Sequence, residues 1–168
     1  MGKVLLGIAL GVLLVFGAVL AFVYGGGLPV ATSGTLLPGE VFLTGVALRR
    51  AIGAEAERPS PLPADEAALL AGARVFKANC AVCHGLPGQA QPSAIARGLF
   101  PKAPQLWPPH KGVTDDPVGE TFWKVKNGIR LTGMPGFGGA LTDDDLWRVS
   151  ALVQRADKAT PAVLEALR

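Results

Sequence analysis

Cys80-Ala81-Val82-Cys83-His84 is the stretch from which the rest of this sequence is best interpreted. Two cysteines separated by two residues and followed directly by a histidine form the attachment motif of a covalently bound haem. In this motif both sulfurs form thioether bonds and the histidine ligates the iron. The spacing therefore predicts one haem attached through Cys80 and Cys83, with His84 as an axial ligand.

Two other kinds of site share the Cys-x-x-Cys spacing. One is a thioredoxin-like dithiol and the other is half of a zinc site. Zinc would need a further soft ligand, yet Cys80 and Cys83 are the only cysteines and His110 is the only other histidine. The histidine directly after Cys83 favours haem attachment over both alternatives, and no cysteine is left for a disulfide framework.

The residues on either side of the motif resemble the class I c-type cytochromes over roughly residues 64 to 157. Gly72 and Phe76 stand where that family has a small residue and an aromatic residue on its N-terminal helix. Residues 104–106 look like its Pro-x-Leu element, and residues 133–137 look like the loop that carries its methionine ligand. The resemblance implies an all-α, cytochrome c-like haem domain that transfers electrons and is not itself an enzyme.

The resemblance also implies the second axial ligand. Met134 is the only methionine besides Met1, so a thioether ligand has one candidate, although a lone methionine is ordinarily core filler. His110 is the alternative and would make the iron bis-histidine. The family further implies that the carbonyl of Pro104 accepts a hydrogen bond from the His84 ring, which would fix the plane of that ring.

Three helices are predicted within the haem domain, over about 64–79, 117–127 and 142–155. Gly72 would let the first and last of these cross closely. The glycine and proline residues of 85–109 predict an irregular loop. Thr160 and Pro161 predict a short helix in the C-terminal tail, with the threonine as its cap.

The N-terminus predicts a membrane anchor. Val4 to Tyr24 comprises 21 residues without a charge. As a helix with a rise of about 1.5 Å per residue it would extend roughly 31 Å, close to the hydrocarbon thickness of a bilayer. The competing interpretation is a secretory signal, but the apolar region of a signal is normally only about 7 to 15 residues long.

Four regions follow from these patterns. We predict a transmembrane anchor over 1–24, a Gly/Pro-rich tether over 25–63, the haem domain over 64–157 and a tail over 158–168. Within the tether, Glu40 to Ile52 predicts a short helix. This helix would lie either against lipid or a partner subunit, or on the haem domain.

The family attaches its haem outside the cytoplasm, which implies a single-pass protein of the bacterial cytoplasmic membrane with a periplasmic haem domain. The partners of this protein would be the lipid bilayer and redox proteins. The sequence has no run of Lys or Arg that would indicate binding to nucleic acid. Residues 70–131 carry eight basic and three acidic side chains, a local charge of +5 that would steer acidic partners. Two alternatives are a cytochrome subunit of a larger oxidoreductase and a haem sensor or peroxidase with a labile Met134.

Overall fold

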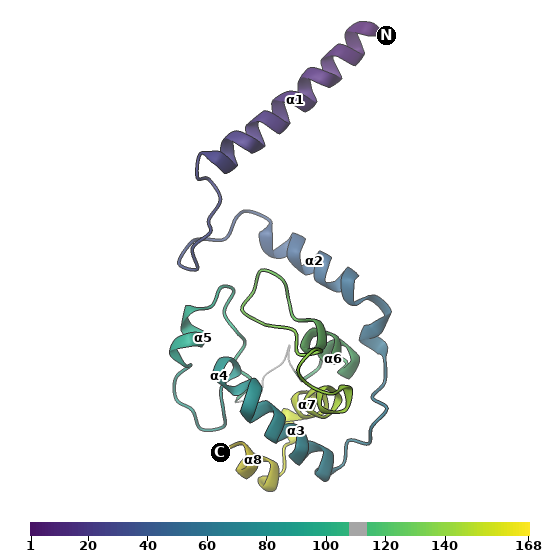
Figure 1. Ribbon diagram of the computed structural model, residues 1–168, viewed down its shortest axis with the longest axis vertical. Coiled ribbons are helices and arrows are strands. Elements are labelled where there is room, and N and C mark those ends of the chain that lie inside the picture. The colour runs from purple at the N-terminus through teal and green to yellow at the C-terminus, as the bar shows by residue number, and fades with distance from the viewer. Residues whose placement is uncertain (108–113) are drawn as a thin grey trace. The chain divides into compact units, whose positions relative to one another are not determined.

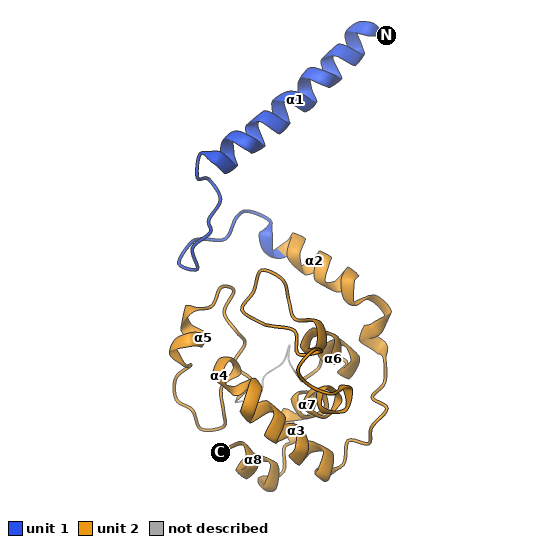
Figure 2. Ribbon diagram, viewed as in Figure 1, with its two compact units in different colours: residues 1–41 blue, residues 42–168 orange. Residues whose placement is uncertain are grey.

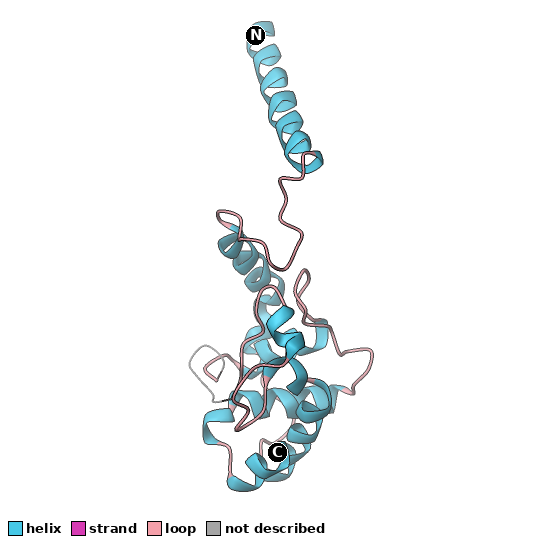
Figure 3. Ribbon diagram, turned by 90° about the vertical axis from the view of Figure 1, so that its left-hand side faces the viewer, coloured by secondary structure: helices cyan, strands magenta, loops and turns pink. Residues whose placement is uncertain are grey.

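The computed structural model describes residues 1–107 and 114–168. Every regular element in these residues is a helix, as Figures 1 and 3 show. The predicted all-α fold is therefore confirmed. His110, the alternative ligand, lies outside the described residues.

The chain divides into two compact units, residues 1–41 and residues 42–168 (Figure 2). The first contains α1 (Gly2–Tyr24), which is long and apolar enough to cross a membrane and lies near the N-terminus, where a signal sequence passes the same test. The four regions predicted from the sequence remain a prediction. The structure itself groups residues 42–63, part of the predicted tether, with the haem domain.

The helices that were predicted are all present, within a residue or two at their ends. Asp65 and Thr142 are the N-caps of α3 (Glu66–Asn79) and α7 (Asp143–Gln154), since their side chains accept hydrogen bonds from Ala68 N at 2.8 Å and Asp145 N at 3.2 Å. A helix within 85–109, capped by Ser93, was not predicted. After α1 come α2 (Glu40–Ile52), η1 (Gly53–Glu57), α3 (Glu66–Asn79), α4 (Ala81–His84), α5 (Ala94–Gly98), α6 (Val118–Asn127), α7 (Asp143–Gln154), η2 (Ala156–Lys158) and α8 (Pro161–Leu167).

The core forms where α3 crosses α7. A Cβ on Gly72 of α3 would overlap the Arg148 carbonyl of α7, so the predicted close crossing at Gly72 is confirmed. Phe76 and Leu152 are 1% exposed at this crossing. Since buried side chains of this size each contribute about 1.5–3 kcal/mol, the crossing is a main source of stability.

Residues 53–58, in the second half of the predicted tether, pack on α6 and α7. A Cβ on Gly119 of α6 would overlap carbonyl oxygens of η1, so these two elements touch through their backbones. The Arg58 guanidinium lies over the rings of Phe122 and Trp147, 5.7 and 5.5 Å from their centroids. Those two rings stack at 3.9 Å. Residues 53–58 therefore belong to the packed structure around α6 and α7.

Candidate haem site

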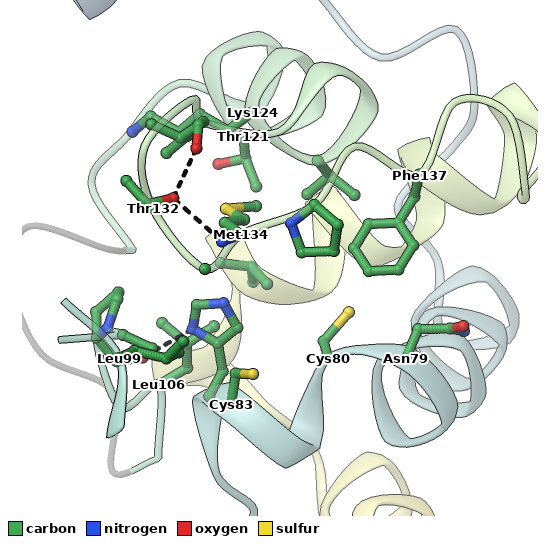
Figure 4. A pocket seen from close by; sticks show the side chains of 18 of the residues that line it. Asn79, Cys80, Cys83, Leu99, Leu106, Thr121, Lys124, Thr132, Met134 and Phe137 are labelled. Carbon is green, nitrogen blue, oxygen red and sulfur yellow. Dashed lines mark hydrogen bonds between the residues drawn. The ribbon is translucent and has the colours of Figure 1, made fainter. Parts of the chain in front are cut away.

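One cavity of about 280 Å³ lies among α3, α4, α6, α7 and the loops between them (Figure 4). The sequence-predicted residues Cys80, Cys83, His84, Pro104 and Met134 all line it. In Figure 4 Cys80 and Cys83 lie on one side of the cavity and Met134 lies on the other. Most of the remaining lining is apolar and includes Phe76, Leu99, Leu106, Val125, Ile129, Phe137, Val149 and Val153.

The side formed by residues 80–84 and 104–106 is here called the cysteine wall. The chain turns directly from α3 into α4, because His84 N donates to Cys80 O at 3.0 Å. Gly85 ends α4 with φ +79°, a conformation that favours glycine. One helical turn thus presents both thiols and the imidazole to the same cavity.

Three hydrogen bonds join α4 to residues 104–106. The His84 Nδ1 lies 2.8 Å from the Pro104 carbonyl oxygen, Gln105 Nε2 donates to Cys83 O at 2.9 Å, and Leu106 N donates to His84 O at 2.9 Å. A carbonyl can only accept, so Nδ1 carries the proton and donates it. The ring is therefore fixed in the tautomer that leaves Nε2 available to a metal, as metal-binding histidines require.

The opposite side, residues 129–137, is here called the methionine wall. Thr132 Oγ1 donates to Ile129 O at 2.7 Å and accepts from Met134 N at 3.1 Å, while Ile129 N donates to Met134 O at 3.2 Å. Gly128, with φ +70°, lets this loop approach the end of α6, since its Cβ would lie 2.5 Å from Gly136 N. These contacts hold the Met134 backbone in one position against α6.

The electrostatics of the cysteine wall do not suit a redox dithiol. Burial, and secondarily the neighbouring Cys83, raise the pKa of the Cys80 thiol from 9.0 to about 12. A nucleophilic dithiol needs a lowered thiol pKa. The described residues contain no group of three or more His, Cys, Asp or Glu side chains placed to hold a metal ion.

A charged corner of the cavity was missed from the sequence. Lys124 Nζ lies 2.9 Å from Asp116 Oδ2 and 2.6 Å from Glu120 Oε1, and Lys124 and Asp116 both line the cavity. Burial alone would lower the pKa of Lys124, but its hydrogen bonds to Glu120 and Asp116 outweigh burial and raise it. The four-residue spacing of Glu120 and Lys124 within a predicted helix was the available signal.

Leu48 of α2 also lines the cavity. With Ile52 buried at 4% exposure, it shows that this helix packs on the haem domain through one of its sides. The sequence had left open whether α2 would pack on the domain or on lipid or a partner. Its position in the cavity wall had no signal in the sequence.

The residues of the cavity fit a haem. Two thiols stand near one side of a mainly apolar space, an imidazole with a fixed tautomer faces it, and a thioether lies across from the thiols. An all-helical unit with these groups around one cavity has the arrangement of a c-type haem protein. The comparisons with known proteins agree.

A family model described as "Cytochrome C oxidase, cbb3-type, subunit III" matches residues 67–153. The chain is also similar to cytochrome c6 of Limnospira maxima, with 37% identity over 89 residues that cover 52% of this chain and 93% of that protein. No solved structure matches.

The chain belongs to this family of c-type cytochromes. It is therefore an electron-transfer haem protein, and its family implies a covalent haem c. The resemblance to c-type cytochromes stated from the sequence is confirmed.

Proposed function

We propose that this protein is a membrane-anchored monohaem cytochrome c that passes single electrons between redox proteins at the periplasmic face of a bacterial cytoplasmic membrane. The observation that carries the proposal is the cavity, where Cys80, Cys83, His84 and Met134 come together from elements up to 54 residues apart in the sequence. The apolar α1 supports the anchor. Haem attachment outside the cytoplasm, implied by the family, supports the periplasmic side.

Each wall has its own task in this proposal. Cys80 and Cys83 would form the thioethers to the haem, and His84 would bind its iron through the nitrogen that the hydrogen bond to Pro104 leaves available. Met134 would be the second protein ligand of the iron. When bound, the haem supplies a one-electron couple, and a histidine–methionine pair raises its reduction potential relative to more strongly donating pairs.

The other residues that line the cavity determine the environment of the bound group. The mainly apolar lining leaves few polar groups to reorganise when the charge inside the cavity changes. If His84 and Met134 both bind the iron, no position on it would be left for a substrate. We therefore propose electron transfer without catalysis, with donor and acceptor docking outside the cavity.

A potentiometric spectral titration of the purified holoprotein tests the ligands. Met134→Ala should abolish the sulfur-to-iron charge-transfer band of the oxidised protein. It should also lower the potential by on the order of 0.2 V, within the span of about 0.8 V set by axial ligation. His110→Ala should change neither. The reverse pattern would replace Met134 with His110 as the ligand.

A second candidate is a subunit of a larger membrane oxidoreductase. It is favoured by one observation, the match to a family described as a subunit of a cbb3-type oxidase. Purification in a mild detergent separates the two candidates. Fixed stoichiometric partners that survive gel filtration would favour the subunit, whereas a single chain with reversible redox chemistry would favour the tethered carrier.

A further inference from the structure

The helix α2 is apolar on two opposite sides. One side packs on the haem domain, where Ile52 is buried and Leu48 lines the cavity. Gly45 lies on this side at helical spacing, and the Arg49 side chain covers it, with Nη1 3.3 Å from where a Cβ would be. The other apolar side of α2 faces away from the haem domain and is not covered by it.

That second surface begins in the first turn of α2. Phe42 and Leu43 are 70% and 65% exposed, and Ala47 is exposed one turn further on. At 100° per residue, Leu43 and Ala47 point away from the side that carries Leu48 and Ile52. A single exposed leucine is ordinary, but adjacent large apolar side chains on one outward face indicate an interaction surface.

The charges on α2 indicate what covers this surface. Arg49 and Arg50 lie in the last turn, and no acidic residue follows Glu40 before Glu55. An exposed apolar face followed by basic residues is the composition of helices that lie in the headgroup region of anionic membranes. Arginine suits this position because its stem packs on apolar groups while its charge reaches the phosphates.

The chain keeps α2 near such a membrane. Residues 25–39 are all that separates α1 from α2. If α1 spans the bilayer, as the proposed function requires, fifteen residues reach at most about 50 Å even when fully extended. A lipid surface is then always within reach of α2, at a high effective concentration that a separate protein partner does not share.

We infer that the face of α2 formed by Phe42, Leu43, Ala47 and Arg50 docks in the headgroup region of an anionic bilayer. This inference rests on the proposed anchoring by α1. Leu48, on the other side of the same helix, lines the haem cavity. Docking of α2 would therefore hold the side of the cavity that Leu48 lines near the membrane surface. The haem domain then has a preferred orientation toward membrane-bound redox partners and does not swing freely.

Nitroxide labels on the full-length holoprotein in phosphatidylcholine–phosphatidylglycerol vesicles test the inference. Leu43→Cys and Ala47→Cys can be labelled selectively, since Cys80 and Cys83 are consumed by the haem. Labels at both positions should collide more with oxygen than with a water-soluble nickel chelate. A label at the exposed Lys158→Cys should show the opposite preference.

A label at Val12→Cys in α1 distinguishes a failure of the docking inference from a failure of the proposed anchor. If position 12 is in lipid while positions 43 and 47 are in water, docking is wrong and the anchor stands. If position 12 is in water, the anchor itself is wrong. Protection of positions 43 and 47 only in native membranes, and not in pure lipid, would assign the face to a protein partner and overturn the inference.

Arg50 provides a second measurement. Arg50→Gln should reduce the ratio of docked to undocked protein in anionic vesicles about fivefold, the effect of one basic side chain near such a surface. In phosphatidylcholine vesicles the same change should have little effect. Arg74→Gln, at an exposed position on α3, is the matched control and should leave docking unchanged in both.

Discussion

The two walls of the haem cavity are held in place by different means. The cysteine wall is joined to residues 104–106 by hydrogen bonds that span 20 and 22 residues of sequence, from His84 to Pro104 and from Gln105 to Cys83. The methionine wall is a loop that packs its backbone on the end of α6 through Gly128. The cysteine wall is therefore held mainly by hydrogen bonds to a distant segment, whereas the methionine wall is held by backbone packing at a glycine and by the local bonds of Thr132.

This difference has a functional meaning. The cysteine wall makes bonds that form once, during attachment of the haem. The methionine wall supplies a ligand that must be held in position at every oxidation and reduction. We therefore expect damage to the first wall to abolish the cofactor and damage to the second to weaken stability and ligation.

The largest effect is expected from Cys80→Ala combined with Cys83→Ala. Without either thiol no thioether forms, so the denatured protein should lose its haem completely. Mass spectrometry and haem staining after denaturing electrophoresis measure this loss. Met134→Ala is the control and should keep the covalent haem. Haem that remains attached in the double variant would refute the separation of roles between the walls.

A matched pair of glycines compares the walls directly. Gly85 and Gly128 each end a helix, with φ of 79° and 70° and ψ of 175° and −178°, a region almost restricted to glycine. Their neighbours differ. A Cβ on Gly85 would meet the Gln105 side-chain oxygen at 2.9 Å, whereas a Cβ on Gly128 would meet backbone atoms of residues 134–136 at 2.5–2.9 Å.

Both alanine substitutions should therefore lose about 1–3 kcal/mol of unfolding free energy through backbone conformation. Gly128→Ala should lose a further 1–3 kcal/mol, roughly the cost of overpacking, because backbone cannot move aside as a flexible side chain can. Denaturant titration of the two holoproteins gives the comparison. If both variants lose the same unfolding free energy and Gly128→Ala keeps the sulfur-to-iron band, the backbone of the methionine wall moves aside as easily as the Gln105 side chain of the cysteine wall.

The sequence predicted most of the cysteine wall because its chemistry is local or depends on residue type. Cys80, Cys83 and His84 are adjacent, and Pro104 was found through a recognisable element of the family. The helices were predictable for a similar reason, since Thr142 and Thr160 are caps whose partners lie three residues away. Contacts between residues that are close in the sequence can be predicted without knowing how distant segments pack.

What was missed depends on contacts between distant segments. The packing of residues 53–58 on α6 requires Gly119, whose role is visible only once η1 is seen beside it. Leu48 lines the cavity from α2, although it has the sequence pattern of an ordinary leucine of an amphipathic helix. The short helix α5 was hidden because glycine and proline dominate its surroundings and only Ser93 marks its start.

The smallest effect concerns the charged corner, which adjoins the methionine wall because Gly128 N donates to Lys124 O at 2.8 Å. The pKa of Lys124 is raised above 10.5 in the folded protein, so its protonated form stabilises the fold. This contribution is complete below pH 10.5 and declines as the pH rises through the raised pKa. The stability advantage of the unmodified protein over Lys124→Met should therefore shrink in that alkaline range.

Denaturant midpoints measured from neutral pH to above the raised pKa provide the test, and Lys124→Arg is the matched control. A guanidinium stays charged at alkaline pH, so Lys124→Arg should keep whatever stability its pairs with Asp116 and Glu120 provide. If the advantage over Lys124→Met is the same at every pH, the lysine acts through packing alone. The charged corner would then be a passive part of the cavity, and the methionine wall would depend only on Gly128 and the bonds of Thr132.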